Sequence, residues 1–381
     1  RTMTWQSDSP VNFFNVVAAR WAEKRGNGTV IYYHPGHDYN VAEMSEALDA
    51  ARKYFSEWFY PFPWQELKLS EFPGLSAYAQ GFPTDITFSE QIGFLTKSDP
   101  RSNLAFMVTA HEAAHQWWGN ILMPGEGPSG DILSEGMAHF STILLFDQVK
   151  GPEQRIEFLK RIESRYGERR QVDSERPLVK IDGSKDGDQT VTYDKGGWVF
   201  WMLLNEMGRD SALAGNSAFI HKYAHNRDHA LLPDYVEVMR GFAPDTTAYD
   251  AFVDQWFHQV VVPEYKLAGA TKKRVGDTWE VTVEVTNAGT GVMPVEVAAI
   301  TGERFPKRKG APAPGSDAAP AAHAAEKESK DPYLEVRTTV RPAPGEKVNV
   351  QLTCPFEPKS ILVDPDARVL QLNRKHAVAG F

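Results

Sequence analysis

The sequence predicts an α+β fold in which a small mixed sheet and a lobe of helices are followed by a β-sandwich. Strand-like runs at 66–72 and 85–89 come first, and helical patterns then continue almost to Pro263. Beyond that point apolar and polar residues alternate with a period of two, as they do in half-buried antiparallel strands. The change predicts two domains, one over residues 1–264 and a second over residues 265–381.

Turn and capping signals place the first elements. The turn Gly26-Asn27-Gly28 lies within the aromatic and β-branched stretch 13–33, which predicts a β-hairpin. Asn40 is a favourable N-cap with Glu43 three residues later, so a helix is expected to begin after it and to stop before Pro61. Its buried face is formed by residues at helical spacing, namely Val41, Met44, Leu48, Ala51, Phe55, Trp58 and Phe59.

Later elements follow from the same signals. Gly151-Pro152 is expected to separate two helices, Gly208 to end another, and Asp245 to cap a further one. Strict alternation predicts the strands of the second domain, at 279–286, 333–340 and 347–352. The segment 306–331 is rich in alanine, proline, lysine and glutamate, a composition typical of a flexible loop. The single cysteine, Cys354, is expected to be a buried thiol in a strand.

Composition limits the classes of partner. The formal net charge of the 381 residues is −9, which argues against a nucleic-acid surface because phosphate binding requires a positive field. No apolar run approaches the eighteen residues that a membrane-spanning helix needs. The sequence begins at Arg1 without a secretion signal, and we therefore expect a piece of a larger protein whose location is unknown.

The segment His111-Glu112-Ala113-Ala114-His115 carries the strongest chemical signal. Positions i and i+4 of a helix share one face, so two imidazoles can converge on a single ion while Glu112 projects beside them. A catalytic zinc site needs three protein ligands and an open fourth position. Glu135, twenty residues after His115, is the candidate for the third ligand.

The surrounding sequence supports a metal site over a chance pair of histidines. Residues 102–118 have the apolar spacing of one helix, with Gly119 placed to stop it. Glu126 is the weaker ligand candidate, because it lies in a loop rich in glycine and proline that would not hold a carboxylate in place. The alternative for Glu126 is a solvated loop charge.

Four segments, in the same order, resemble the aminopeptidase N family of zinc metallopeptidases, the gluzincins. His111–Asn120 looks like its HExxHQWxGN segment, and Leu133–Ala138 looks like its LNEGFA segment. Tyr193–Leu203 is similar to its YxKGxxxxxML segment, and Asp254–Pro263 resembles the close of its helical region. Chance is a poor explanation for four matches in the family's order.

The resemblance implies a thermolysin-like catalytic domain followed by a β-sandwich, with one zinc ion per chain and a peptide substrate. His111, His115 and Glu135 would bind the zinc, and Glu112 would act as the general base. Tyr193 would stabilise the oxyanion, although a core aromatic is the alternative for that side chain. The stretch 1–33 would hold the last strands of an amino-terminal β-domain.

The chain departs from the family pattern at two places. Nineteen residues, Gln116 to Ser134, separate the second histidine from Glu135, whereas the family has eighteen. The run Tyr78-Ala79-Gln80 stands where the family carries GxMEN, whose glutamate holds the free amino group of the substrate. We expect these three residues to contact substrate, with an ordinary polar strand edge as the alternative for Gln80.

These departures leave several functions open. The main expectation is an aminopeptidase with altered recognition of the amino terminus. An endopeptidase or a hydrolase of a non-peptide substrate could use the same zinc site. The Tyr-Ala-Gln segment and the β-sandwich also resemble the peptidase portion of proteins fused to a membrane permease region, which implies membrane association. In such a protein the domain could serve as a peptide-binding sensor for the transporter.

Overall fold

The computed structural model describes the chain except for residues 1, 3, 5, 8–10, 12, 75, 96, 100–102, 225–227 and 306–331. It contains two compact units, Arg1–Ile162 with Arg169–Gln259, and Glu163–Glu168 with Val260–Phe381. The loop expected at 306–331 lies outside the described residues. The boundary at residue 264, and the origin of 1–33 in a longer β-domain, stay predictions.

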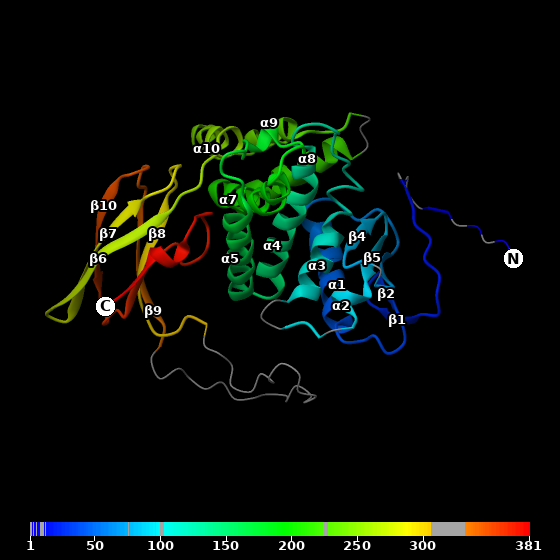
Figure 1. The fold of residues 1–381 in the computed structure, drawn as a ribbon, viewed down its shortest axis with the longest axis horizontal. Coiled ribbons are helices and arrows are strands. Elements are labelled where there is room, and N and C mark those ends of the chain that lie inside the picture. Colours follow the sequence, from blue (N-terminus) through cyan, green and yellow to red (C-terminus); the bar gives the residue numbers. More distant parts are fainter. Residues whose placement is uncertain are drawn as a thin grey trace. The chain divides into compact units, whose positions relative to one another are not determined.

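The first unit contains a five-stranded mixed sheet with the strand order β1-β2-β3-β5-β4 (Figure 1). β2, β3 and β5 run parallel, whereas β1 and β4 pair antiparallel at the two edges. The hairpin predicted around Gly26-Asn27-Gly28 is confirmed, and β4 is a short edge strand that the sequence pattern did not predict. The strands are β1 (Ala22–Arg25), β2 (Thr29–Tyr33), β3 (Leu67–Phe72), β4 (Ala79–Phe82) and β5 (Asp85–Ser89).

Helices α1 (Val41–Trp58) and α3 (Leu104–Ala114) pack on each other beside this sheet, and α3 also packs on α4 (Met137–Val149) (Figure 1). The start of α1 after Asn40 is confirmed, but the predicted side-chain cap is wrong. The side-chain Nδ2 of Asn40 instead donates to the Gly93 carbonyl, at 2.6 Å, and the side-chain Oδ1 accepts from the Ser98 backbone amide, at 2.9 Å. Asn40 therefore joins the start of α1 to the segment that leads into α3.

The prediction of one helix over 102–118 is wrong at its carboxyl end, because α3 ends at Ala114. Tertiary contacts of the following residues explain the early end. The indole nitrogens of Trp117 and Trp118 donate to the Tyr60 carbonyl and to Ser141 Oγ, and both rings are buried. Gly119 then adopts a φ of +148°, which L side chains rarely adopt.

The remaining helices of the first unit form a lobe around α4 and α7, which pack on each other. The predicted helix ends at Gly151-Pro152 and Gly208 are confirmed, and Asp245 caps α10 by accepting from the amides of Thr247 and Ala248. The lobe contains α5 (Pro152–Arg169), α7 (Gly196–Met207), α8 (Arg209–Tyr223), α9 (Leu232–Arg240) and α10 (Thr246–His258). Residues Glu163–Glu168 of α5 belong to the second unit. The short helices α2 (Glu90–Gly93) and α6 (Asp188–Thr190) lie outside the lobe in the first unit.

The second unit contains two antiparallel sheets, with strand orders β10-β7-β6 and β12-β11-β8-β9. The strands predicted by alternation are confirmed, and Cys354 is a buried free thiol in β10 as expected. The strands are β6 (Tyr265–Val275), β7 (Thr278–Asn287), β8 (Val295–Thr301), β9 (Leu334–Val340), β10 (Lys347–Cys354), β11 (Ser360–Val363) and β12 (Val378–Gly380).

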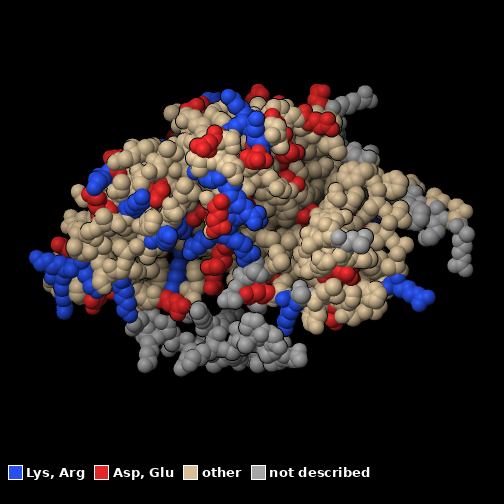
Figure 2. All heavy atoms as spheres, in the orientation of Figure 1, with Lys and Arg blue, Asp and Glu red and all other residues tan. Residues whose placement is uncertain are grey.

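Charged side chains of both signs lie interspersed over much of the face shown in Figure 2. Within the described part of the chain, no helix has both the length and the apolar character needed to cross a membrane.

Candidate metal centre and active site

Three side chains predicted as zinc ligands converge on one point. His111 Nε2 lies 3.1 Å from Glu135 Oε2, His115 Nε2 lies 3.2 Å from the same oxygen, and the two nitrogens are 3.3 Å apart. Zinc bonds of about 2.0–2.2 Å in a tetrahedral site place neighbouring ligand atoms about 3.3–3.5 Å apart. The triangle of donor atoms therefore has the size and the chemistry that a tetrahedral zinc ion requires.

Two π-helical turns bring the other parts of the site to α3. Glu135 lies in the turn η1 (Ile132–Gly136), and Tyr193 lies in the turn η3 (Val191–Lys195). Such turns are rare and occur frequently at functional sites. The two turns touch through glycines, since a Cβ on Gly136 would lie 3.1 Å from the Thr192 carbonyl and 3.4 Å from the Cα of Gly196.

The second nitrogen of each histidine has a partner, which orients the first. His115 Nδ1 lies 3.1 Å from the Trp118 carbonyl and 3.3 Å from Ser134 Oγ. His111 Nδ1 lies 3.0 Å from Nδ1 of His139, a buried residue that the sequence analysis did not single out. A helical spacing of four residues from Glu135 was the signal that could have found His139. Both Nε2 atoms are thus directed at Glu135.

The charges at this triangle are strongly coupled. Burial alone would raise the pKa of Glu135, but hydrogen bonds with His111 and His115 hold that pKa far below its ordinary value. Burial likewise opposes the charged form of His115, yet the hydrogen bond and the charge of Glu135 raise its pKa to about 9. A zinc ion would replace these protons, because a metal binds the neutral imidazole.

Glu112 and Tyr193 flank the triangle. Glu112 is a buried residue of α3 next to His111 in sequence, and its charge adds to the raised pKa values of His115 and Tyr193. The Tyr193 ring stacks on His111, with 5.8 Å between ring centroids and 19° between planes. Burial raises the pKa of Tyr193, and the charge and hydrogen bond of Glu135 raise it further. The phenol is therefore a hydrogen-bond donor near neutral pH.

The edge strand β4 is held against the end of α3. The Gln116 amide donates to the Phe82 carbonyl, at 2.8 Å, and its oxygen accepts from the Thr84 amide, also at 2.8 Å. The amide of Asn120 donates to the Gly81 carbonyl, at 3.2 Å. A Cβ on Gly81 would lie only 2.7 Å from the Glu112 carbonyl oxygen. The strand is thus fixed beside the candidate ligands, and no side chain fits between Gly81 and α3.

The predicted substrate-binding residues lie on this strand and just before it. Residues 79 and 81 point to the same face of a strand and residue 80 to the opposite face. Since Gly81 faces α3, Ala79 faces the same way and the exposed Gln80 faces away from it. Tyr78 is 48% exposed and packs its ring on Phe72, with centroids 4.9 Å apart.

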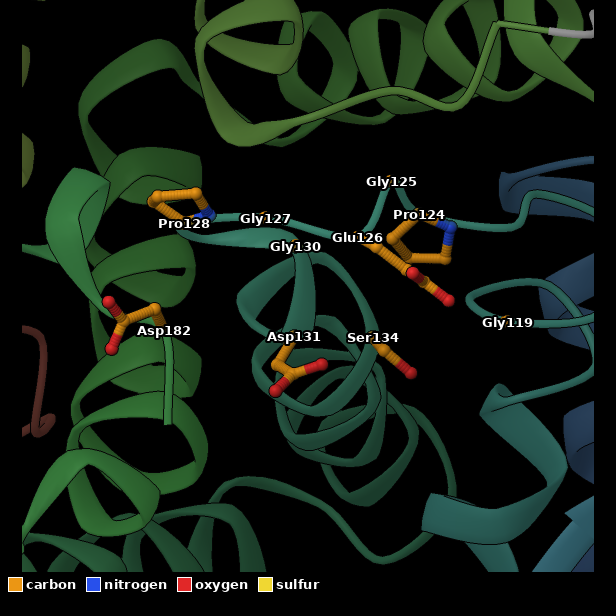
Figure 3. A pocket seen from close by; sticks show the side chains of 10 residues that line it. All are labelled: Gly119, Pro124, Gly125, Glu126, Gly127, Pro128, Gly130, Asp131, Ser134 and Asp182. Carbon is orange, nitrogen blue, oxygen red and sulfur yellow. The ribbon is translucent and has the colours of Figure 1, made fainter. Parts of the chain in front are cut away.

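A cavity of about 500 Å³ lies beside the turn η1 that carries Glu135 (Figure 3). Ser134, which precedes Glu135, and Gly119, which follows the tryptophan pair, both line it. Glu126 is exposed in its rim and does not belong to the triangle of donor atoms (Figure 3). None of the three candidate ligands is among the residues that line the cavity.

The chain is similar to known aminopeptidases over part of its length. Rice (Oryza sativa subsp. japonica) aminopeptidase M1-C is 29% identical over 229 residues, which cover 57% of this chain and 25% of the rice protein. Mouse (Mus musculus) endoplasmic reticulum aminopeptidase 1 is 25% identical over 255 residues, which cover 58% of this chain and 26% of the mouse protein. The chain thus spans about a quarter of the length of these relatives.

A solved structure shares the fold. The structure of Legionella pneumophila aminopeptidase A in complex with aspartic acid superposes with a TM-score of 0.58 at 13% identity, covering 90% of this chain and 36% of that one. The model of the peptidase family M1 domain matches residues 39–256, which contain all three converging ligands, Glu112 and Tyr193. The chain therefore belongs to peptidase family M1.

Proposed function

We propose that the chain is a zinc-dependent peptidase, and specifically an aminopeptidase whose recognition of the substrate amino terminus is altered. The observation that carries this proposal is the convergence of His111, His115 and Glu135 within 3.3 Å of one another, with Glu112 and Tyr193 beside them. One zinc ion per chain fits this donor set. When bound, zinc polarises the scissile carbonyl and lowers the pKa of a water to about 7.

Glu112 and Tyr193 perform the proton and charge steps. Glu112 takes a proton from the attacking water and delivers it to the nitrogen of the leaving amine, which general bases do with about 10²- to 10⁴-fold acceleration. Tyr193 keeps its phenolic proton, because burial and the neighbouring carboxylates raise its pKa. It donates a hydrogen bond to the carbonyl oxygen as negative charge develops there.

The edge strand β4 supports an altered recognition of the amino terminus. β4 is an edge strand beside the candidate ligands, and an extended peptide would pair with its outer side through main-chain hydrogen bonds. The family holds the substrate ammonium with a glutamate from its GxMEN segment, whereas β4 is Ala-Gln-Gly-Phe and contains no acidic residue. A charge-assisted bond is about twice as strong as a neutral one, so a free amino terminus is favoured less than in the family.

The absence of an acidic residue from β4 also favours one alternative, cleavage within a peptide. Without such a carboxylate, β4 provides no ion pair that only a substrate with a free amino terminus could form. A hydrolase of non-peptide substrates could also use the zinc site. A sensor domain of a protein fused to a membrane permease would keep the zinc and bind peptides without useful turnover.

The test combines zinc analysis with the turnover of one peptide in free and amino-acetylated forms. We expect one zinc per chain after dialysis, loss of most of it in Glu135→Ala, and retention in the matched Glu126→Ala. The free peptide is expected to be cut faster than the acetylated one. The ratio of the two rates should be smaller than an ion pair with the free amino group would produce. Equal rates would favour the endopeptidase, zinc without turnover would favour the sensor, and zinc loss in Glu126→Ala alone would overturn the ligand assignment.

A further inference from the structure

His139 lies one helical turn after Glu135 and contacts the candidate zinc ligand His111 at the ring nitrogen that faces away from Glu135. It is only 7% exposed, and its Nδ1 lies 3.0 Å from His111 Nδ1, with the two rings nearly perpendicular at 88°. On its other side, His139 Nε2 lies 3.7 Å from Asp194 Oδ1, and Asp194 is 1% exposed. Asp194 follows Tyr193 in η3, so these contacts connect η3 and α4 to His111.

Only one arrangement of protons on the two imidazoles is compatible with a metal ligand. His111 must present the lone pair of Nε2 to the ion, so its proton is on Nδ1. That N–H points at His139 Nδ1, which must accept it and therefore carries no proton. The proton of His139 is then on Nε2, the atom that faces the Asp194 carboxylate.

Packing fixes the His139 ring in this position. A Cβ on Gly197 would lie 2.7 Å from His139 Cβ, so the glycine of α7 allows the two helices to meet here. The rings of Phe158 and Tyr193 lie 5.9 Å and 5.4 Å from the His139 ring. A histidine held this tightly has little freedom to leave His111.

We propose that His139 and Asp194 form a positioning relay that sets the tautomer and ring plane of His111 and so raises zinc affinity. The relay rests on the proposed zinc site and extends it to two residues outside the donor triangle. Ligand histidines usually donate their other N–H to a carboxylate or a carbonyl oxygen, and here an imidazole is inserted between the two. His115 needs no such relay, because its Nδ1 lies within hydrogen-bond distance of the Trp118 carbonyl oxygen.

The test is the dissociation constant for zinc, measured by competition with a chromophoric chelator. His139→Asn and His139→Leu are a matched pair, because the two side chains have nearly the same shape and only asparagine offers an oxygen near the place of Nδ1. We expect His139→Leu to weaken zinc binding by about 10- to 100-fold and His139→Asn to stay within about fivefold of the parent. Ser134→Ala is the control on the His115 side, where the Trp118 carbonyl remains.

Cobalt(II) provides a second readout that packing damage alone would not change. The d–d absorption of the cobalt-loaded chain is expected to shift in His139→Leu and to resemble the parent in His139→Asn. Equal zinc affinity in His139→Leu and the parent would overturn the relay and leave the proposed function intact. An equal loss of zinc affinity in His139→Leu and His139→Asn would also overturn the relay, since the hydrogen-bond acceptor that asparagine supplies would then have no effect. A parent chain without zinc would overturn the proposed function and the relay together.

Discussion

The centre formed by α3, η1 and η3 and the edge strand β4 lie side by side but are built in opposite ways. In the centre, His111, Glu112 and His139 are buried, and the second nitrogen of each candidate histidine ligand has a partner. On β4, Gln80 is exposed, and among the described residues β5 is the one strand paired with β4. The candidate reactive groups are thus fixed by packing, while the surface proposed to bind the peptide is the edge of a strand.

This difference indicates where the chain can vary without losing chemistry. Precise placement of acid–base groups and ligands requires neighbours that lock each side chain, and a shift of about 1 Å can cost about 10²-fold in rate. An edge strand recognises a peptide mainly through main-chain groups, which do not depend on the side chain present. Substitutions in the centre should therefore change turnover by orders of magnitude, and substitutions on β4 by small factors.

The largest expected effect is that of Glu112→Gln. Glutamine keeps the shape of the side chain but cannot accept the proton of the attacking water, so kcat should fall by about 10³-fold or more. Zinc content and peptide affinity should stay near those of the parent, because Glu112 is not one of the converging ligand atoms. Measured kcat with zinc analysis checks this, and near-parental turnover would remove Glu112 from the mechanism.

Tyr193→Phe should have the next largest effect. The variant keeps the ring that stacks on His111 and removes only the hydroxyl, so the fold of η3 should be preserved. Loss of one oxyanion donor costs about 10²- to 10³-fold in kcat, with little change in KM if the bond forms mainly in the transition state. A rise in KM at constant kcat would instead assign the hydroxyl to ground-state binding and weaken the contrast between centre and edge.

The same contrast explains which features the sequence could predict. Two of the three candidate ligands follow from helical spacing, since His111 and His115 lie one turn apart whatever surrounds them, whereas Glu135 was expected from the family resemblance. The π-turns at Glu135 and Tyr193 could not be predicted, because they arise where Gly136 and Gly196 let distant segments touch. The early end of α3 likewise depends on burial of Trp117 and Trp118 in tertiary contacts.

Local patterns were weakest at the edge and at side chains with distant partners. β4 has only four residues and no clear alternation, so its identity as a strand depends on the pairing with β5. Asn40 has the type and position of a cap, but its side chain binds groups more than fifty residues away. His139 lies outside the four matched segments, and its spacing of four residues from Glu135 is the one sequence signal for it; the contact with His111 depends on tertiary packing.

The smallest effect is expected at Gln80, and it tests the edge directly. Because Gly81 faces α3, Gln80 faces away from the candidate ligands, so Gln80→Ala should change the ratio of kcat/KM for free and acetylated peptide by less than about twofold. Gln80→Glu should raise the preference for the free peptide only slightly, because its charge would point into solvent and be screened. The measurement is this ratio in both variants and the parent, with Tyr78→Phe as a control that keeps the ring packed on Phe72. A change above about tenfold in either Gln80 variant would show that this side chain reaches the substrate ammonium, and β4 would then recognise substrate through side chains as well as backbone.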